Sequence, residues 1–265
     1  MRFFSGLYDK AQKQGKAYTA LDAVKLLAII CMTIDHIGAY MLPENQWLRA
    51  IGRVAPVVFL FLVGYSRSTE ISRQLWIYTA ITIAIQPFMA YPLFPMNIMV
   101  SIIIARLALR YCIRRNWLPE KAHEIVIFCA VFSICTMPFF EYGSISILCA
   151  VFGRMVREGH TRHRSLVMIS CVGLFVFWQY IADLYSSVQM LYIIASVGWI
   201  TLWLNTCSNK VIWQAWDNSA WKTGITLLSR NTLTYYFYHR MIFQLIGALI
   251  LGKTLGFTWI WMELD

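Results

Sequence analysis

Long apolar segments separated by short polar loops constrain the fold of this 265-residue chain more than any other feature. A helix needs about 20 mostly apolar residues to cross the roughly 30 Å hydrocarbon layer of a bilayer. Segments of this kind occupy 21–42, 49–66, 72–93, 97–113, 123–140, 143–157, 166–184, 188–205 and 231–251. The sequence therefore predicts an all-α fold, a polytopic integral membrane helical bundle with about nine transmembrane helices. The sixth segment is the shortest, and we expect it to be tilted or partly re-entrant.

Composition excludes the soluble classes of protein. Apolar residues make up 59% of the chain and charged residues 14%, whereas a soluble domain averages about 45–50% apolar and about 25% charged residues. A single soluble core cannot hide so much apolar surface. A chain this rich in aromatic residues also does not stay solvated without folding. A soluble enzyme and a disordered protein are both excluded, and membrane lipid is the expected environment.

The net charge of +10 follows the loops and does not indicate a nucleic acid partner. Cytoplasmic loops of membrane proteins carry an excess of Lys and Arg. Here the basic residues gather before the first segment and after the second, fourth, sixth and eighth, and the loops between the others lack them. We therefore predict a multi-pass membrane protein with a cytoplasmic N-terminus. If the sixth segment did not cross, every later assignment would reverse, and Lys210 and Lys222 would break the rule.

The chain divides into one membrane domain and two short ends. We expect residues 1–20 to form a cytoplasmic amphipathic segment, 21–251 a single transmembrane domain, and 252–265 a short C-terminal tail. No small-residue cleavage site follows the first apolar segment, so we expect it to be retained as a span. The tryptophan-rich stretch 205–223 is typical of an interfacial segment on the cytoplasmic face.

Neither the cysteines nor a pair of loop histidines predicts a metal site. The seven cysteines form no CxxC pair and lie mostly within apolar segments, which argues against a zinc site and a disulfide framework. His160 and His163 have a spacing found in metal sites, but the arginines around them would repel a cation. We therefore expect no metal cofactor.

The first apolar segment contains three ionisable residues, Lys25, Asp35 and His36. A charged residue in a membrane-spanning helix costs about 2.5–3.5 kcal/mol, so such residues are functional candidates by default. Lys25 and His36 share one helix face and lie roughly 16 Å apart along the axis. Taken alone, Lys25 is equally typical of a side chain that extends to the interface, and His36 of a hydrogen-bonded core residue. An adjacent Asp-His pair in an apolar segment is harder to explain without a function.

Arginines in the neighbouring segments are candidate partners for these groups. Arg49 is typical of an interfacial anchor, whereas Arg53 lies one turn deeper and is a reasonable partner for Asp35. Arg106 and Arg110 belong to a basic stripe with four-residue spacing in the fourth segment. Guanidinium groups match phosphate oxygens, so this stripe suits a polyanion.

Two strings in the first half of the chain carry a family resemblance. Lys25, ten intervening residues and His36, ending in MTIDHIG, are followed by LRAIGRVAPVVFLFLVG at 48–64. This order resembles the first two spans of the TraX family, the membrane acetyltransferases of conjugative systems that acetylate the pilin N-terminus. Further residues similar to that family are Asn97, Tyr142, Tyr236 and His239. The resemblance runs from about 20 to 157 and resumes near 231, and 166–222 has no counterpart in it.

The resemblance implies acetyl-CoA as the donor substrate and a pilin or similar small membrane polypeptide as the acceptor. Lys25, Arg106 and Arg110 would then bind the CoA phosphates at the cytoplasmic mouth, with the pantetheine arm extending between helices. Tyr236 and His239 would also belong to the substrate-binding site. Acetyl-CoA is cytoplasmic and polyanionic, which fits the basic loops.

The helix face that Lys25 and His36 share, and the Asp-His pair within an apolar segment, suggest a mechanism for such a transfer. His36 would act as general base, and Asp35 would either orient the imidazole or hold Arg53. Arg53, Asn97 or Tyr142 would stabilise negative charge on the thioester oxygen. An acetyl-histidine intermediate and direct transfer both remain open.

Three alternatives stay open beside this interpretation. A basic residue, ten positions and a histidine also occur in the integral-membrane O-acyltransferases that modify cell-surface glycans. Charged residues in spans are also typical of proton-coupled transporters, although the sequence has no inverted repeat. The third alternative is a non-catalytic membrane subunit that chaperones a small hydrophobic partner.

Overall fold

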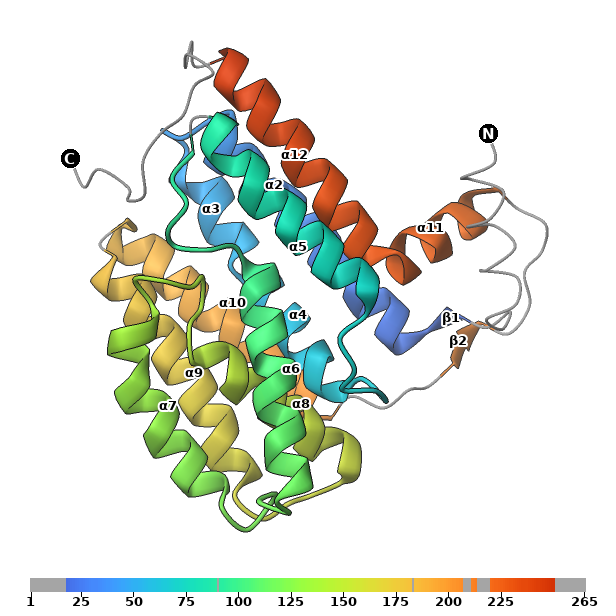
Figure 1. Cartoon of the computed structure of the whole chain (residues 1–265), viewed down its shortest axis with the longest axis vertical. Coiled ribbons are helices and arrows are strands. Elements are labelled where there is room, and N and C mark those ends of the chain that lie inside the picture. The colour runs from blue at the N-terminus through green and yellow to red at the C-terminus, as the bar shows by residue number, and fades with distance from the viewer. Residues whose placement is uncertain (1–17, 90, 183, 207–210, 214–219, 251–265) are drawn as a thin grey trace.

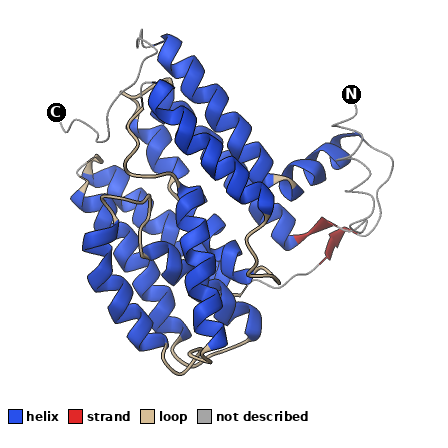
Figure 2. Cartoon of the chain, in the orientation of Figure 1, coloured by secondary structure: helices blue, strands red, loops and turns tan. Residues whose placement is uncertain are grey.

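The chain folds as an all-α protein (Figures 1 and 2). The computed structural model describes residues 18–89, 91–182, 184–206, 211–213 and 220–250, and it is 78% helical. Its strands within these residues are β1 (Tyr18–Thr19) and β2 (Val211–Trp213), which form one antiparallel pair. The all-α class is therefore confirmed. The C-terminal tail, nearly all of the N-terminal segment and much of the interfacial stretch lie outside the described residues.

Each predicted apolar segment contains a helix with similar bounds. The helices are α2 (Ala20–Tyr40), α3 (Gln46–Gly52), α4 (Val54–Tyr65), α5 (Arg73–Ile85), the 3₁₀ helix η1 (Gln86–Met89), α6 (Ile98–Arg114), α7 (Ala122–Thr136), α8 (Ile145–Glu158), α9 (Arg164–Ile181), α10 (Ser187–Asn205) and α12 (Thr232–Ile250). A further helix, α11 (Ala220–Arg230), lies between α10 and α12 and begins within the predicted interfacial stretch.

Three helical stretches in the described part of the chain are long and apolar enough to cross a membrane: Gln46–Tyr65, α9 and α10. The shorter α7 is also apolar. Large apolar side chains cover the outward faces of α7, α9 and α10, where Val131 is 63%, Ile169 64% and Trp199 66% exposed. Exposed apolar faces of this size favour contact with lipid over contact with water. The fold is therefore that of a membrane protein.

The helices form two groups (Figure 1). In one group α12 packs against α2, α5 and α11, and in the other α8 packs against α4, α6, α7 and α9. Contacts of α2 with α3 and α4 join the groups. The 14 residues of α8 span about 21 Å, and most of their side chains are buried. Protein rather than lipid surrounds this sixth segment.

Glycines allow α4 and α8 to approach closely. A Cβ atom at Gly64 would fall on the backbone of Ala150, and one at Gly153 would fall on the backbone of Phe61. Small residues at helix contacts let backbones come together, and this is how membrane helices commonly pack. The contact holds α4 firmly, and α4 in turn presents Phe59 to the site described below.

The second predicted segment is interrupted at Arg53, between α3 and α4. Pro56 has no N–H group, so the carbonyl of Gly52 loses its regular helical partner. The N–H of Arg53 instead donates to the carbonyl oxygen of Ala50, 3.3 Å away. The break places a buried arginine at the junction of two helices.

Capping side chains start the helices that carry the site. Thr19 and Asp22 form a capping box at the start of α2, and Ser186 and Gln189 form another at the start of α10. The Asn97 side chain accepts a hydrogen bond from the N–H of Met99 at 2.9 Å and caps α6. These residues satisfy backbone N–H groups that the first turn of a helix leaves unpaired.

Candidate functional site

Two adjoining cavities lie where the two helix groups meet. The large cavity, about 360 Å³ in volume, is lined by side chains of α2, α4, α6 and α12. The small cavity, about 70 Å³, is lined by α2, α3, α4 and the loop before α8. Phe59, Ile98 and Tyr236 line both cavities. The two cavities therefore adjoin at these three side chains.

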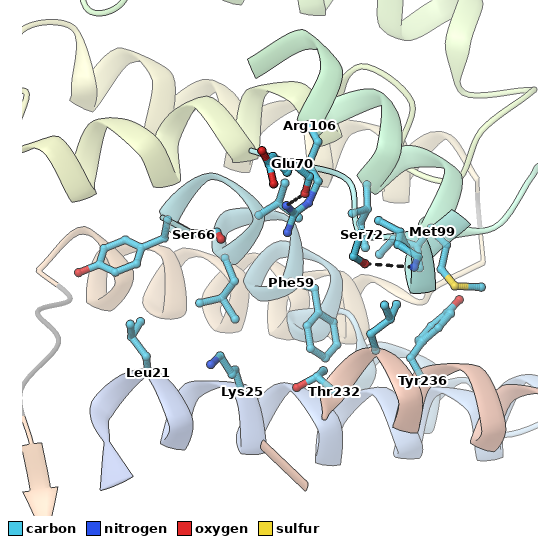
Figure 3. Close-up of a pocket in the computed structure, with 17 residues that line it drawn as sticks. Leu21, Lys25, Phe59, Ser66, Glu70, Ser72, Met99, Arg106, Thr232 and Tyr236 are labelled. Atoms are coloured by element: carbon cyan, nitrogen blue, oxygen red, sulfur yellow. Dashed lines mark hydrogen bonds between the residues drawn. The ribbon is translucent and has the colours of Figure 1, made fainter. Parts of the chain in front are cut away.

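The large cavity is mostly apolar, with a few charged groups (Figure 3). In Figure 3, Lys25 and Ser66 lie on one side of the cavity and Tyr236 on the other, with Arg106 above them. The Lys25 ammonium lies 3.4 Å from the Asp22 carboxylate. A mostly apolar cavity with cationic groups among its walls suits a ligand with an apolar arm and an anionic head.

Arg106 also holds the loop between α4 and α5. Its Nη1 donates to the carbonyl oxygens of Ser68 at 3.2 Å and Glu70 at 2.6 Å. Its Nε is buried and has no hydrogen-bond partner among the described residues. Arg106 thus keeps donor capacity beside the large cavity.

Five of the ten candidate residues that the sequence singled out line the small cavity: Asp35, His36, Arg53, Tyr142 and Tyr236. Asp35 and His36 come from α2, Arg53 from the break between α3 and α4, and Tyr142 from the loop before α8. His36 is 9% and Arg53 7% exposed. Burial strengthens the electrostatic interactions among these groups, because little water screens them.

A hydrogen-bonded pair of histidines determines the tautomer of His36. Nδ1 of His239 lies 2.9 Å from the carbonyl oxygen of Tyr235, which can only accept, so this nitrogen carries a proton. Nε2 of neutral His239 is then an acceptor, and it lies 2.7 Å from Nδ1 of His36. His36 therefore donates from Nδ1, and its Nε2 keeps a free lone pair. A histidine held in this way is equipped to accept a proton.

Asp35 is paired with two guanidinium groups rather than with His36. Its Oδ2 lies 3.1 Å from Nη1 of Arg49, and its Oδ1 lies 3.4 Å from Nη2 of Arg53. The predicted pairing of Asp35 with Arg53 is present. The partner that orients the His36 imidazole is His239 on α12.

Arg53 also donates hydrogen bonds to the hydroxyl groups of two tyrosines. Its Nε donates to the hydroxyl of Tyr185 at 2.7 Å, and its Nη1 donates to the hydroxyl of Tyr142 at 3.2 Å. Tyr142 has a φ of 65°, a left-handed conformation that is rare for an aromatic residue. Burial raises the pKa of Tyr142 and outweighs the opposing effect of the Arg53 charge. The phenol therefore stays protonated and can donate a hydrogen bond.

Arg240 lies behind Tyr236, at the junction of the cavities. Its Nη1 donates to the Tyr236 hydroxyl at 2.7 Å, and its Nη2 donates to Oε1 of Gln86 at 3.4 Å. Arg240 is 5% exposed and forms no ion pair with any carboxylate in the described ranges. Its positive charge favours negative charge near the Tyr236 hydroxyl, whose own hydrogen remains free to be donated.

Three predicted binding residues, Asn97, Arg110 and His239, line neither cavity. Asn97 is fully buried; its Oδ1 caps α6, and its Nδ2 has no hydrogen-bond partner among the described residues. Arg110 donates to the carbonyl oxygen of Thr69 at 3.1 Å, and His239 contributes through its hydrogen bond to His36. In the part of the chain that the structure describes, no group of three or more His, Cys, Asp or Glu side chains could hold a metal ion.

Comparison with known proteins identifies the family. The family model described as TraX protein matches residues 20–246. The chain belongs to the TraX family. An uncharacterized protein of Rickettsia prowazekii (strain Madrid E) is 29% identical over 152 residues, a match that covers 56% of this chain and 60% of that relative. The chain thus matches less than two thirds of the relative's length. No solved structure matches the chain.

The family match confirms the resemblance that the motifs indicated. It also extends through 166–222, for which the motifs had no counterpart. Tyr185 belongs to this stretch and holds Arg53, so the stretch contributes to the same site. No local signal marked Tyr185, because it lies in a short loop between two apolar segments.

Three further residues of this candidate site were not predicted from the sequence. Glu141 and Tyr40 line the small cavity, and Arg49, which we expected only as an interfacial anchor, pairs with Asp35. Tyr40 follows His36 by four residues and therefore shares its helix face, which is a signal that could have found it. Glu141 directly precedes Tyr142, which is a weaker signal.

Proposed function

We propose that this chain is a membrane acetyltransferase that moves an acetyl group from acetyl-CoA to the N-terminal amine of a pilin or similar small membrane polypeptide. The observation that carries the proposal is the free Nε2 lone pair of His36, a buried base that lines the small cavity near Tyr236, which both cavities share. Membership of the TraX family supports a role in the processing of conjugative pilins.

The large cavity is suited to the donor. Lys25 and Arg106 would attract the phosphates of CoA, and the apolar walls would cover the pantetheine arm. Lys25 and His36 lie roughly 16 Å apart along one helix, a gap that the arm is long enough to bridge. The thioester would then reach the junction beside Tyr236, with the acceptor in the small cavity.

His36 alone can move the protons that the proposed transfer step requires. Nε2 of His36 takes a proton from the acceptor ammonium, and that proton leaves to water. The neutral amine then attacks the thioester carbonyl, forming the C–N bond. His36 takes a second proton from the attacking nitrogen and gives it to the CoA sulfur as the C–S bond breaks. The products are an acetylated amine, CoA thiol and one released proton.

Two donors could stabilise the oxygen of the tetrahedral intermediate. The Tyr236 hydroxyl lies at the junction with Arg240 behind it, and the Tyr142 hydroxyl lines the small cavity beside Arg53. Donors already in place where charge develops contribute more than donors that must reorganise. Asn97 lines neither cavity, so we assign the role to the two tyrosines instead.

We further propose that the chain crosses a bacterial inner membrane nine times with its N-terminus in the cytoplasm. The basic loops support this orientation. It places the Lys25 end of the large cavity toward cytoplasmic acetyl-CoA, and His36 in the outer third of the membrane. A processed pilin presents its N-terminus on that outer side.

The test is the intact mass of the cognate pilin from cells that carry the wild-type chain, His36→Ala or no chain. A gain of about 42 Da, the mass of one acetyl group, should require the wild-type chain. His123→Ala, which replaces an exposed histidine outside both cavities, is the matched control and should keep the gain. An unchanged pilin mass in every strain would remove the pilin as acceptor and favour a surface glycan, transport or a chaperone role.

A further inference from the structure

Glu141 lines the small cavity and has no role in the proposed transfer step. Its Oε2 accepts a hydrogen bond from the N–H of Ile98 at 2.7 Å. Its N–H donates to the carbonyl oxygen of Met96 at 2.8 Å, and its carbonyl oxygen accepts from the Ser101 hydroxyl. Glu141 is therefore held on both its backbone and its side chain, beside the cavity that His36 lines.

The two carboxylates of the small cavity differ in their partners. Asp35 lies between Arg49 and Arg53, which neutralise it. Among the described residues, Glu141 forms no ion pair: its hydrogen-bond partner is an uncharged backbone N–H, and the positive charge of Arg240 acts on it only from a distance. A half-buried carboxylate with no counter-charge in contact carries a desolvation cost. A cation supplied by the substrate would remove this cost.

The geometry points to Glu141 as the residue that binds the ammonium group of the acceptor and selects an amine over a hydroxyl. This inference rests on the proposed function and adds the residue that recognises its substrate. An ammonium gains a charge-assisted hydrogen bond from Glu141, whereas the hydroxyl of a glycan carries no charge and gains much less. The small cavity, about 70 Å³, has room for a chain end next to the base.

Glu141 and His36 then act in sequence on one nitrogen. Glu141 binds the positively charged form, in which the acceptor arrives. His36 then removes a proton from the ammonium. The neutral amine is held less strongly by the carboxylate and can attack the thioester. Glu141 therefore affects how tightly the acceptor binds, and His36 affects how fast the amine reacts.

The experiment uses the purified full-length chain in lipid nanodiscs with acetyl-CoA and two synthetic peptides. The peptides share one sequence and differ only in an N-terminal amino or hydroxyl group. Glu141→Gln keeps an acceptor for the Ile98 N–H but removes the charge, and Glu141→Asp keeps the charge. Glu44→Gln, an exposed residue outside both cavities, is the matched control.

We expect Glu141→Gln to raise the KM for the amino peptide by at least about tenfold, the scale of one charge-assisted hydrogen bond. The KM for acetyl-CoA and the rate with the hydroxyl peptide should not change, and Glu141→Asp should stay closer to the wild type. An unchanged KM for the amino peptide in Glu141→Gln would overturn the inference. Acetylation of neither peptide by the wild type would instead reject the proposed function.

A second measurement keeps the test decisive if Glu141→Gln does not fold. Propylammonium should inhibit the wild-type chain competitively against the amino peptide, whereas propanol at the same concentration should not. Equal effects of the two compounds would show that the site does not recognise the charge, and would overturn the inference equally.

Discussion

The two adjoining cavities differ in how their charged groups are held. In the large cavity the Lys25 side chain is 31% exposed, and apolar side chains form most of the wall. In the small cavity the Arg53 side chain is 8% exposed and is bonded to Asp35, Tyr142 and Tyr185. A partly exposed charge can attract a ligand, whereas a buried charge held by several partners maintains a geometry. Under the proposed function, the large cavity is therefore suited to binding the donor, and the small cavity to holding the reacting groups.

Of the changes proposed, removal of the Asp35 charge should have the largest effect, and this effect should be a loss of folding stability. Asp35→Ala leaves Arg49 and Arg53 without their carboxylate, and breaking a buried pair costs about 3–5 kcal/mol. The measurement is the free energy of unfolding in detergent. Glu120→Ala, which breaks an exposed pair with Arg162, should cost only about 0–1 kcal/mol. Equal losses in the two variants would contradict the view that the small cavity depends on its ion pairs.

Tyr236→Phe should have the largest effect on rate without loss of donor binding. Removal of one oxyanion donor typically lowers kcat by about 10²–10³-fold. Tyr238→Phe changes an exposed tyrosine on the same helix and should retain the wild-type rate. The measurements are kcat with a peptide acceptor and the rise in Tm on addition of CoA. A normal kcat in Tyr236→Phe would remove the junction hydroxyl from the chemistry.

The features that local sequence decides were predictable. The apolar segments predicted the helices, because each segment is long enough to fix its own secondary structure, and the Asp35–Arg53 pair followed from depth in adjacent segments. The partner of His36 did not follow, because His239 lies on α12 and meets α2 only through packing between distant parts of the chain.

The same reasoning explains the residues whose positions differ from expectation. Asn97 lies at the start of α6, and its Oδ1 accepts a hydrogen bond from the N–H of Met99 and caps this helix. Its place near the site in the sequence therefore did not mean that its side chain faces the site. Arg110 lies on the same basic stripe as Arg106, yet it binds a loop carbonyl away from both cavities. The side of a helix that faces a cavity depends on its neighbours, and spacing within one helix does not contain that information.

Substitution of His239 should have a smaller effect. It separates two contributions of this residue, the hydrogen bond that orients His36 and the packing of its ring against His36. His239→Phe keeps an aromatic ring against His36, but it cannot accept the proton from Nδ1. We expect kcat to fall about 10–100-fold, the scale found when a partner that orients a functional histidine is removed. His239→Gln keeps an acceptor and should lose less. If the two variants lose equally, the hydrogen bond does not determine the tautomer of His36.

Lys25→Ala should have the smallest effect, and it tests the large cavity directly. We expect the KM for acetyl-CoA to rise about tenfold while kcat stays unchanged, since one charge-assisted contact is lost. The difference should shrink as salt is added, because Lys25 is partly exposed and ions screen its charge. Lys121→Ala, an exposed lysine outside both cavities, is the control. A lower kcat with an unchanged KM would place Lys25 in the chemistry and break the division between a binding cavity and a reacting one.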